Sequence, residues 1–185
     1  VPADELLRID TCFAVSAGLG LVDTIRGYYF QERCLLLALR AGEPHRIARA
    51  LAVEASYSSA EGGPARERTG RLLERSEALA TKLLHPYARA WSTAAAGIAA
   101  TLEGRWAAGH AACERAEVLF RDKCTGVAWE IDEVGEARRV ADVGVEIAAI
   151  LRFAKALGDA ARQLGQLAEV GHGPERPPAH RVDLP

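Results

Sequence analysis

Apolar residues recur at helical spacing along most of the chain. Six stretches each carry one apolar stripe at intervals of three or four residues, which is typical of amphipathic helices. No window shows the sustained period-two alternation that predicts a strand. The chain is therefore predicted to be all-α. The six stripes begin at Leu6, Phe30, Ile47, Leu72, Tyr87 and Trp106.

Glycine and proline separate the predicted helices. Proline suits the first turn of a helix and glycine suits the position just after its end. Because the breaks are short, successive helices are expected to form antiparallel hairpins. The expected breaks are Gly18-Leu19-Gly20, Gly42-Glu43-Pro44, Gly62-Gly63-Pro64, His85-Pro86, Gly104 and Cys124-Thr125-Gly126.

The last third of the chain has a less regular pattern. Gly135 and Gly144 interrupt the apolar face that follows Val127, so one broken helix or two are expected there, and Gly158-Asp159 is expected to start a last short helix. Residues 171–185 are rich in Gly, Pro, His and Arg and are predicted to be disordered. The predicted organisation is three hairpins over 1–132, a divergent helical continuation over 133–170 and a disordered tail over 171–185.

A short internal repeat supports the hairpin prediction. The triplets Glu32-Arg33-Cys34, Glu74-Arg75-Ser76 and Glu114-Arg115-Ala116 recur at about 40-residue intervals. Each triplet falls in the second helix of a predicted hairpin. One hairpin cannot bury its own apolar faces, but a stack of hairpins can. The repeat therefore predicts an α-solenoid built from stacked antiparallel hairpins.

The unit over residues 90–121 resembles a tetratricopeptide repeat. Gly97 stands where that family has a small residue at a close helix crossing, and Gly104 stands at its turn glycine. Trp106 follows as the aromatic residue, and Ala116 is the small residue near the end of the second helix. The resemblance implies a TPR-like scaffold for protein–protein interaction.

A longer resemblance involves residues 1–10, the stretch GLGLVDTIRG…LLLALRAGEPHRIARALAVEAS and the stretch ACERAEVLFRDKCTGVAWEID. Together they resemble the helical-repeat region that follows the kinase domain in large bacterial serine/threonine protein kinases with an ATPase-like middle region. The resemblance covers residues 1 to 132. It implies that the chain is a regulatory or docking segment of such a kinase.

The motifs of the kinase reaction are not found in this chain. There is no Gly-rich loop followed by a strand lysine, no His-Arg-Asp loop, no Asp-Phe-Gly and no Walker lysine. We therefore predict a chain with no catalytic residue and no cofactor.

Composition restricts the partners. The net charge is −2 and opposite charges are interleaved, so a basic surface for nucleic acid is not expected. No apolar run is long enough for a membrane span and no signal peptide is visible, which favours a cytoplasmic location with reduced cysteines. The chain lacks methionine and begins at Val1, so we expect it to be part of a longer protein.

Arginines near the Ala-rich helices are the candidate binding residues. Arginine on the first helices of stacked hairpins would suit an acidic peptide or a terminal carboxylate, with tryptophan lining the groove. The alternatives are a solvated polar face for the arginines and packing between hairpins for the tryptophan. The candidate peptide-binding residues are Arg46, Arg49, Arg89 and Trp91.

His110 and Cys113 lie three residues apart on one predicted helix face. They provide only half of a zinc site, so no metal is expected. No carboxylate is evident that would orient the histidine for catalysis. Two alternatives to the peptide-binding scaffold remain open. One is a structural spacer, or a module that self-associates through uncapped repeat ends, in an ATPase-type transcription regulator; the other is a small enzyme that uses Cys113 and His110.

Overall fold

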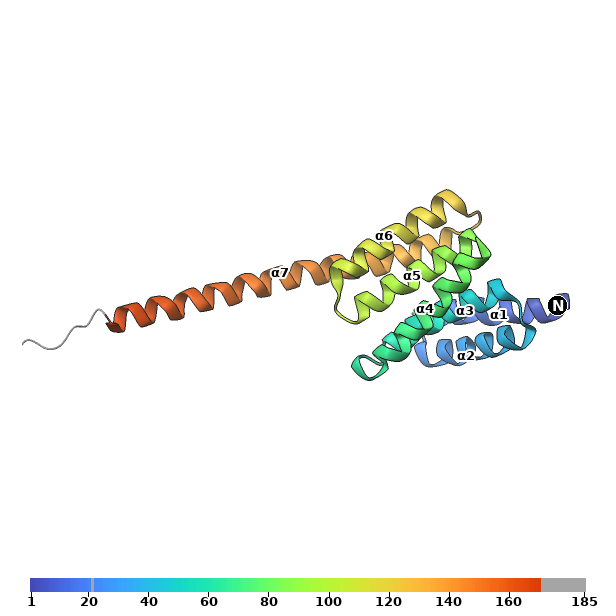
Figure 1. Ribbon diagram of the computed structural model, residues 1–185, viewed down its shortest axis with the longest axis horizontal. Coiled ribbons are helices and arrows are strands. Elements are labelled where there is room, and N and C mark those ends of the chain that lie inside the picture. Colours follow the sequence, from blue (N-terminus) through green and yellow to red (C-terminus); the bar gives the residue numbers. More distant parts are fainter. Residues whose placement is uncertain (21, 171–185) are drawn as a thin grey trace, which may run out of the picture. The chain divides into compact units, whose positions relative to one another are not determined.

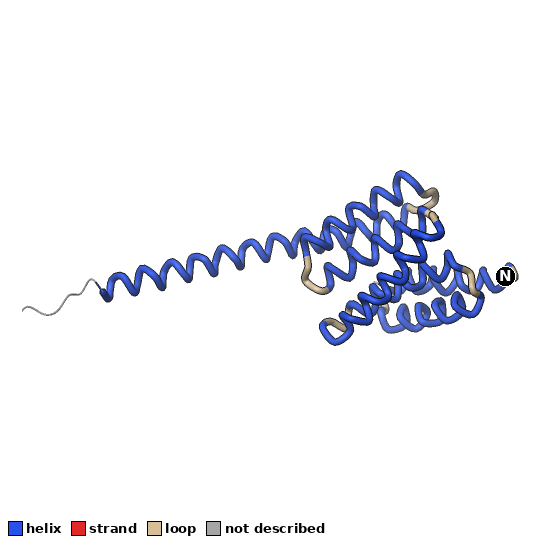
Figure 2. Tube along the Cα trace, viewed as in Figure 1, coloured by secondary structure: helices blue, strands red, loops and turns tan. Residues whose placement is uncertain are grey.

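The computed structural model describes residues 1–20 and 22–170, which contain seven α-helices, one short 3-10 helix and no strand (Figures 1 and 2). The all-α prediction is confirmed. The chain divides into two compact units, residues 1–145 and 146–185. The elements are α1 (Ala3–Gly20), α2 (Thr24–Ala41), α3 (Pro44–Ser59), η1 (Gly63–Ala65), α4 (Arg66–Leu83), α5 (Pro86–Leu102), α6 (Trp106–Lys123) and α7 (Ala128–Val170).

Most helix ends lie where glycine and proline predicted them. Gly42 ends α2 in the left-handed conformation, with a φ of 67°. Pro44 and Pro86 open α3 and α5, and the side chain before each proline caps the helix. Glu43 accepts hydrogen bonds from two main-chain N–H groups of α3, and the ring of His85 accepts one from α5. These turns are therefore encoded locally.

The expected turn at Gly18-Leu19-Gly20 is wrong, because these residues form the last turn of α1. The glycines there serve the packing of helices. A Cβ added to Gly27 of α2 would lie 3.1 Å from the main-chain nitrogen of Gly20 and 2.6 Å from the hydroxyl of Tyr57. The missing side chains thus let α1, α2 and α3 approach closely.

The expected breaks after Val127 are also wrong. Helix α7 runs unbroken from Ala128 to Val170, through Gly135, Gly144 and Gly158. A glycine inside a helix costs roughly 1 kcal/mol relative to alanine but does not by itself end the helix. At Gly144 the missing side chain makes room for Trp106, because an added Cβ would overlap the indole ring. The predicted disorder of residues 171–185 lies outside the described residues.

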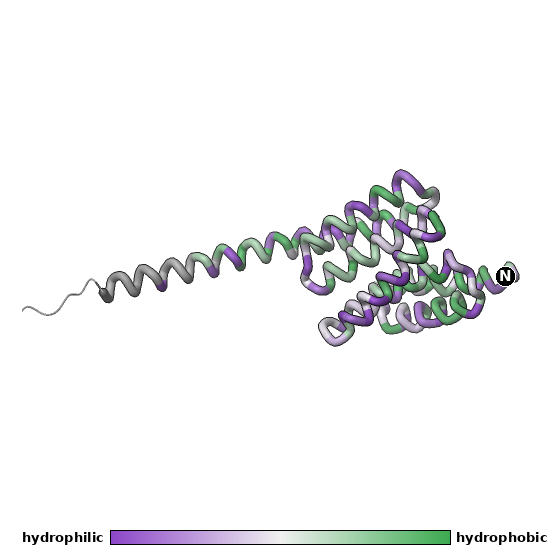
Figure 3. The backbone as a smooth tube through the Cα atoms, viewed as in Figure 1, coloured by the Kyte–Doolittle hydropathy of each residue, from purple (hydrophilic) through white to green (hydrophobic). Residues whose placement is uncertain are grey.

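Successive helices of the first unit pack in pairs: α1 with α2, α3 with α4, and α5 with α6. Helix α3 also packs on α2, and α5 packs on α3 and α4. Apolar and polar positions interchange along these helices, as amphipathic helices require (Figure 3). The buried core is rich in alanine, and its largest fully buried side chains are Trp91 and Phe120.

The three triplets occupy equivalent places in the three hairpins. Their Glu-Arg pairs are exposed, whereas Cys34, Ser76 and Ala116 are fully buried. Cys34 Sγ donates to the carbonyl of Ile9 at 3.6 Å, and Ser76 Oγ donates to the carbonyl of Ala48 at 2.9 Å. In both cases the acceptor lies on the first helix of the same hairpin. The third position of the triplet therefore packs the two helices of a hairpin together.

Candidate functional site

Arg46 and Arg49 of α3 both bind Asp10 of α1. Arg46 donates to the two carboxylate oxygens at 3.0 and 2.5 Å, and Arg49 donates at 2.7 Å. The Arg49 guanidinium also lies over the Phe13 ring, 3.9 Å from its centroid. Burial raises the pKa of Asp10, but the hydrogen bonds from the two arginines outweigh this effect and the pKa is lowered overall.

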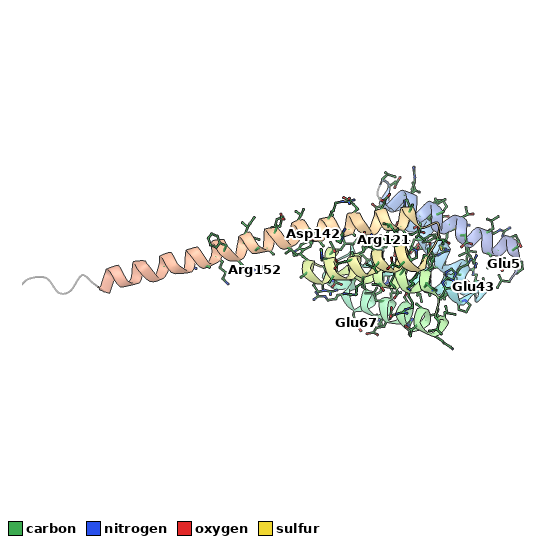
Figure 4. The ribbon with its side chains drawn as sticks, turned by 90° about the horizontal axis from the view of Figure 1, so that it is seen from above. Glu5, Glu43, Glu67, Arg121, Asp142 and Arg152 are labelled. Carbon is green, nitrogen blue, oxygen red and sulfur yellow. The ribbon has the colours of Figure 1, made fainter. Side chains whose placement is uncertain are left out.

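Glu43, labelled in Figure 4, adds a second carboxylate to this cluster, 3.4 Å from Arg46. The cluster thus holds two positive and two negative charges. The side chain of Arg46 is only 19% exposed and that of Arg49 only 7%. The hydrogen bonds from both arginines to Asp10 join α3 to α1. Little of their positive charge is therefore available to an incoming peptide.

Trp91 lies in the core of the first unit. Its side chain is 2% exposed and packs edge-to-face against Phe13 at 5.4 Å and Phe120 at 5.8 Å between ring centroids. The indole Nε1 has no hydrogen-bond partner among the described residues, although it lies near Tyr87. This position agrees with the alternative interpretation, in which the tryptophan packs between hairpins and does not line a binding groove.

Arg89 is exposed on α5 and lines an open groove of about 550 Å³ between α5 and α6. None of Arg46, Arg49 and Trp91 lines this groove. Within the part of the chain that the structure describes, neither Arg89 nor Arg115 forms an ion pair. The groove also offers apolar surface, because Val118 is 45% exposed. Its lining consists of Arg89, Thr93, Glu114, Arg115, Val118 and Leu119.

A cavity of about 320 Å³ in the first unit was not anticipated from the sequence. Its walls come from α1, α2, α3, α5 and α7 and are mainly apolar, with Phe13 and Trp91 among the lining residues. Glu133 of α7 also lines it, and the Oε2 atom of this carboxyl is buried without a hydrogen-bond partner among the described residues. Burial, reinforced by the negative charge of Glu130, raises the pKa of Glu133 to about 7.

The position of Glu133 could have been found from helical spacing. In α7 the buried residues Glu130, Val134 and Ala141 follow one another at intervals of four and seven residues, which defines an inward face. Glu133 belongs to this face because it lies three residues after Glu130. A glutamate on an inward face is the signal for a carboxyl with a raised pKa.

The Cys/His pair is divided between two environments. His110 Nδ1 lies 2.5 Å from Asp142 of α7, which is labelled in Figure 4. The expectation that no carboxylate orients this histidine is therefore wrong, because the sequence does not reveal how α6 and α7 pack. Cys113 is fully buried and burial raises its pKa to about 11, so the thiol is protonated at neutral pH. No group of three or more His, Cys, Asp or Glu residues within 1–20 and 22–170 could hold a metal ion.

No protein-family model, curated protein or solved structure matches this chain. None of the described helices combines the length and the apolar character that crossing a bilayer requires.

Proposed function

We propose that this chain is a non-catalytic, TPR-like helical-repeat scaffold that binds an acidic peptide segment of a partner protein. The groove between α5 and α6 carries the proposal, because Arg89 and Arg115 line it without an ion-pair partner among the described residues. Guanidinium groups recognise carboxylates by charge-assisted, often bidentate hydrogen bonds. A groove that exists before binding also reduces the ordering cost of association.

The equivalent placement of the three triplets supports a repeat architecture. In each hairpin the exposed Glu-Arg pair lies on the second helix and the next residue is buried against the first. A partner that binds one hairpin would therefore meet related charges on its neighbours. The buried, protonated thiol of Cys113 supports a role without nucleophilic catalysis.

The groove provides a matched test. A fluorescent peptide of alternating glutamate and leucine should bind the chain, and the same peptide with glutamine for glutamate should bind more weakly. Arg89→Glu and Arg115→Glu should each weaken the glutamate peptide by about tenfold, since a charge-assisted hydrogen bond contributes roughly 1.5–3 kcal/mol. Fluorescence polarisation at several salt concentrations measures both effects.

Arg75→Glu is the control, because Arg75 holds the position in α4 that Arg115 holds in α6 and does not line the groove. Its affinity for the peptide should equal that of the unmodified chain. Equal losses in Arg75→Glu and Arg115→Glu would show a non-specific effect of net charge and would refute the groove as the binding site.

We further propose that the scaffold is the docking segment of a bacterial serine/threonine protein kinase, as its sequence resemblance suggests. The coding sequence upstream of Val1 tests this link. A kinase domain with its strand lysine, catalytic aspartate and metal-binding aspartate would support it. An in-frame stop codon directly upstream would refute it.

A second candidate function, self-association, is favoured by exposed apolar side chains on α7. Ile147 is 52% exposed and Ile150 is 66% exposed. Spacing that alternates between three and four residues is the pattern by which one helix packs against another in a coiled coil. A second copy of the chain would provide the identical surface. The pattern continues in the sequence through Ala154, Leu157, Ala161 and Leu164.

Light scattering over a range of concentrations tests this candidate. The unmodified chain should form a dimer that Ile150→Asp disrupts. Arg152→Asp is the control, because Arg152 is charged already and lies off the apolar spacing (labelled in Figure 4). A monomer at every concentration would exclude self-association and leave the peptide-binding proposal intact.

A further inference from the structure

The cavity beside Glu133 presents hydrogen-bond acceptors but few donors. Tyr57 donates its hydroxyl hydrogen to the carbonyl of Ser16 at 3.1 Å. Thr24 and Ser56 each donate to the carbonyl four residues earlier, at 3.1 and 3.5 Å. The hydroxyl hydrogens of all three lining residues are thus already committed to main-chain carbonyls. Besides the indole N–H of Trp91, what remains for a ligand is lone pairs and the unpartnered Oε2 of Glu133.

The rest of the cavity is apolar and aromatic. Phe13 and Trp91 contribute rings, and Val53 and Ile98 contribute aliphatic surface. The indole N–H of Trp91 lies near Tyr87, a residue outside the lining. A volume of about 320 Å³ is at the small end of the roughly 300–1,000 Å³ found for ligand pockets. The space therefore suits a compact apolar molecule with one donor group.

We propose that this cavity binds a small apolar amine, whose ammonium group donates to the Glu133 carboxylate while its apolar body packs against Phe13 and Trp91. An ammonium group has three donors and no acceptor, so it complements a rim of acceptors. Its positive charge is attracted both by the carboxylate and by the aromatic rings. An alcohol of the same shape lacks the charge and offers one donor only.

Binding should release protons from the carboxyl group. With a pKa of about 7, roughly half of the Glu133 side chains are protonated at neutral pH. An ammonium ligand stabilises the ionised form, so those protons pass to the buffer. Among the lining residues, Tyr57 of α3 is the other titratable group, and Glu130 is the neighbouring charge on α7. The lining residues of α1, α2 and α5 carry no titratable side chain.

Isothermal titration with phenethylamine and with 2-phenylethanol tests the proposal. The amine should bind at least about tenfold more tightly than the alcohol, as expected for a charge-assisted hydrogen bond. Titrations in two buffers with different ionisation enthalpies should show a release of about half a proton per amine near pH 7. Glu133→Gln should abolish both the preference for the amine and the proton release.

Two further variants make the result decisive. Glu136→Gln removes an exposed carboxylate from the same helix and should leave amine binding unchanged. Val53→Trp fills the cavity and should abolish binding of both probes, with circular dichroism confirming that the variant is folded. The proposal is overturned if neither probe binds the unmodified chain, if both bind equally, or if the amine binds Glu133→Gln as tightly. Arg115→Glu leaves the cavity intact, so the two binding proposals can fail separately.

Discussion

Glu133→Gln is expected to stabilise the fold at alkaline pH and to have little effect in mild acid. Burial raises the pKa of this carboxyl from 4.5 to about 7. Between these two values the folded chain holds a proton that the unfolded chain has lost. Stability therefore falls as the pH rises from about 4.5 and continues to fall until the folded carboxyl has ionised above about 7.

The size of the effect follows from the shift. A difference of one pKa unit corresponds to about 1.4 kcal/mol, so a rise from 4.5 to about 7 corresponds to about 3 kcal/mol. Glutamine has nearly the same shape and carries no charge at any pH. The stability of Glu133→Gln relative to the unmodified chain should thus be about 2–3 kcal/mol greater at about pH 8.5 than at about pH 4.

Urea unfolding followed by circular dichroism measures this difference, with the free energy extrapolated to zero denaturant. His45, whose pKa is lowered to about 4 by burial and by His85, titrates with the opposite sign. It is present in both proteins, so its contribution cancels in the comparison. Glu136→Gln removes an exposed carboxylate from the same helix and is the control for the loss of one negative charge. If the free energies of unfolding of Glu133→Gln and of the unmodified chain differed by the same amount at every pH between about 4 and about 8.5, the assignment of a buried, protonated carboxyl would be refuted.

Three further predictions concern packing and ion pairs. Gly97→Ala should destabilise the fold by about 2 kcal/mol in urea unfolding, because the added Cβ would lie 2.6 Å from Cys113 Sγ. Gly70→Ala should instead stabilise the fold by about 0.5–1 kcal/mol, because the added Cβ would meet no atom within 4 Å. Iodoacetamide should label the partly exposed Cys124 under native conditions, whereas Cys113 should react only after unfolding. Equal labelling rates of the two thiols, measured by mass spectrometry, would contradict the burial of Cys113. Asp10→Asn should cost about 2 kcal/mol at neutral pH, and this cost should shrink as the pH falls below about 3.8, where the carboxyl of the unfolded chain is already protonated.

The helices and most of their ends could be predicted because their causes are local. Pro44, Pro86 and Gly42 act through their own backbone conformations, and the apolar stripes specify which face of each helix is buried. The interruption predicted at Gly144 failed because the space beside it depends on Trp106, far away in the sequence. Propensity alone cannot distinguish a glycine that breaks a helix from one that accommodates a neighbour.

The candidate site was harder to predict for the same reason. Arg46 and Arg89 look alike in the sequence, since both are arginines near the start of a helix. Only the packing of α1 on α3 brings Asp10 to Arg46, and only the pairing of α5 with α6 leaves Arg89 without an ion-pair partner among the described residues. The charge of a side chain can be read from sequence, but whether that charge is already neutralised depends on tertiary contacts.

The pairing of neighbouring helices has a kinetic consequence. Contacts between α1 and α2, or between α3 and α4, join segments that are close in sequence, and chains rich in such contacts fold rapidly. As the chain leaves the ribosome, these hairpins can form before α5 has been synthesised. The contact between Phe13 and Trp91 must wait for α5, and the carboxyl of Glu133 arrives only with α7. The amine cavity is therefore completed after the hairpins that form its first walls, so a bound amine would stabilise the last step of folding.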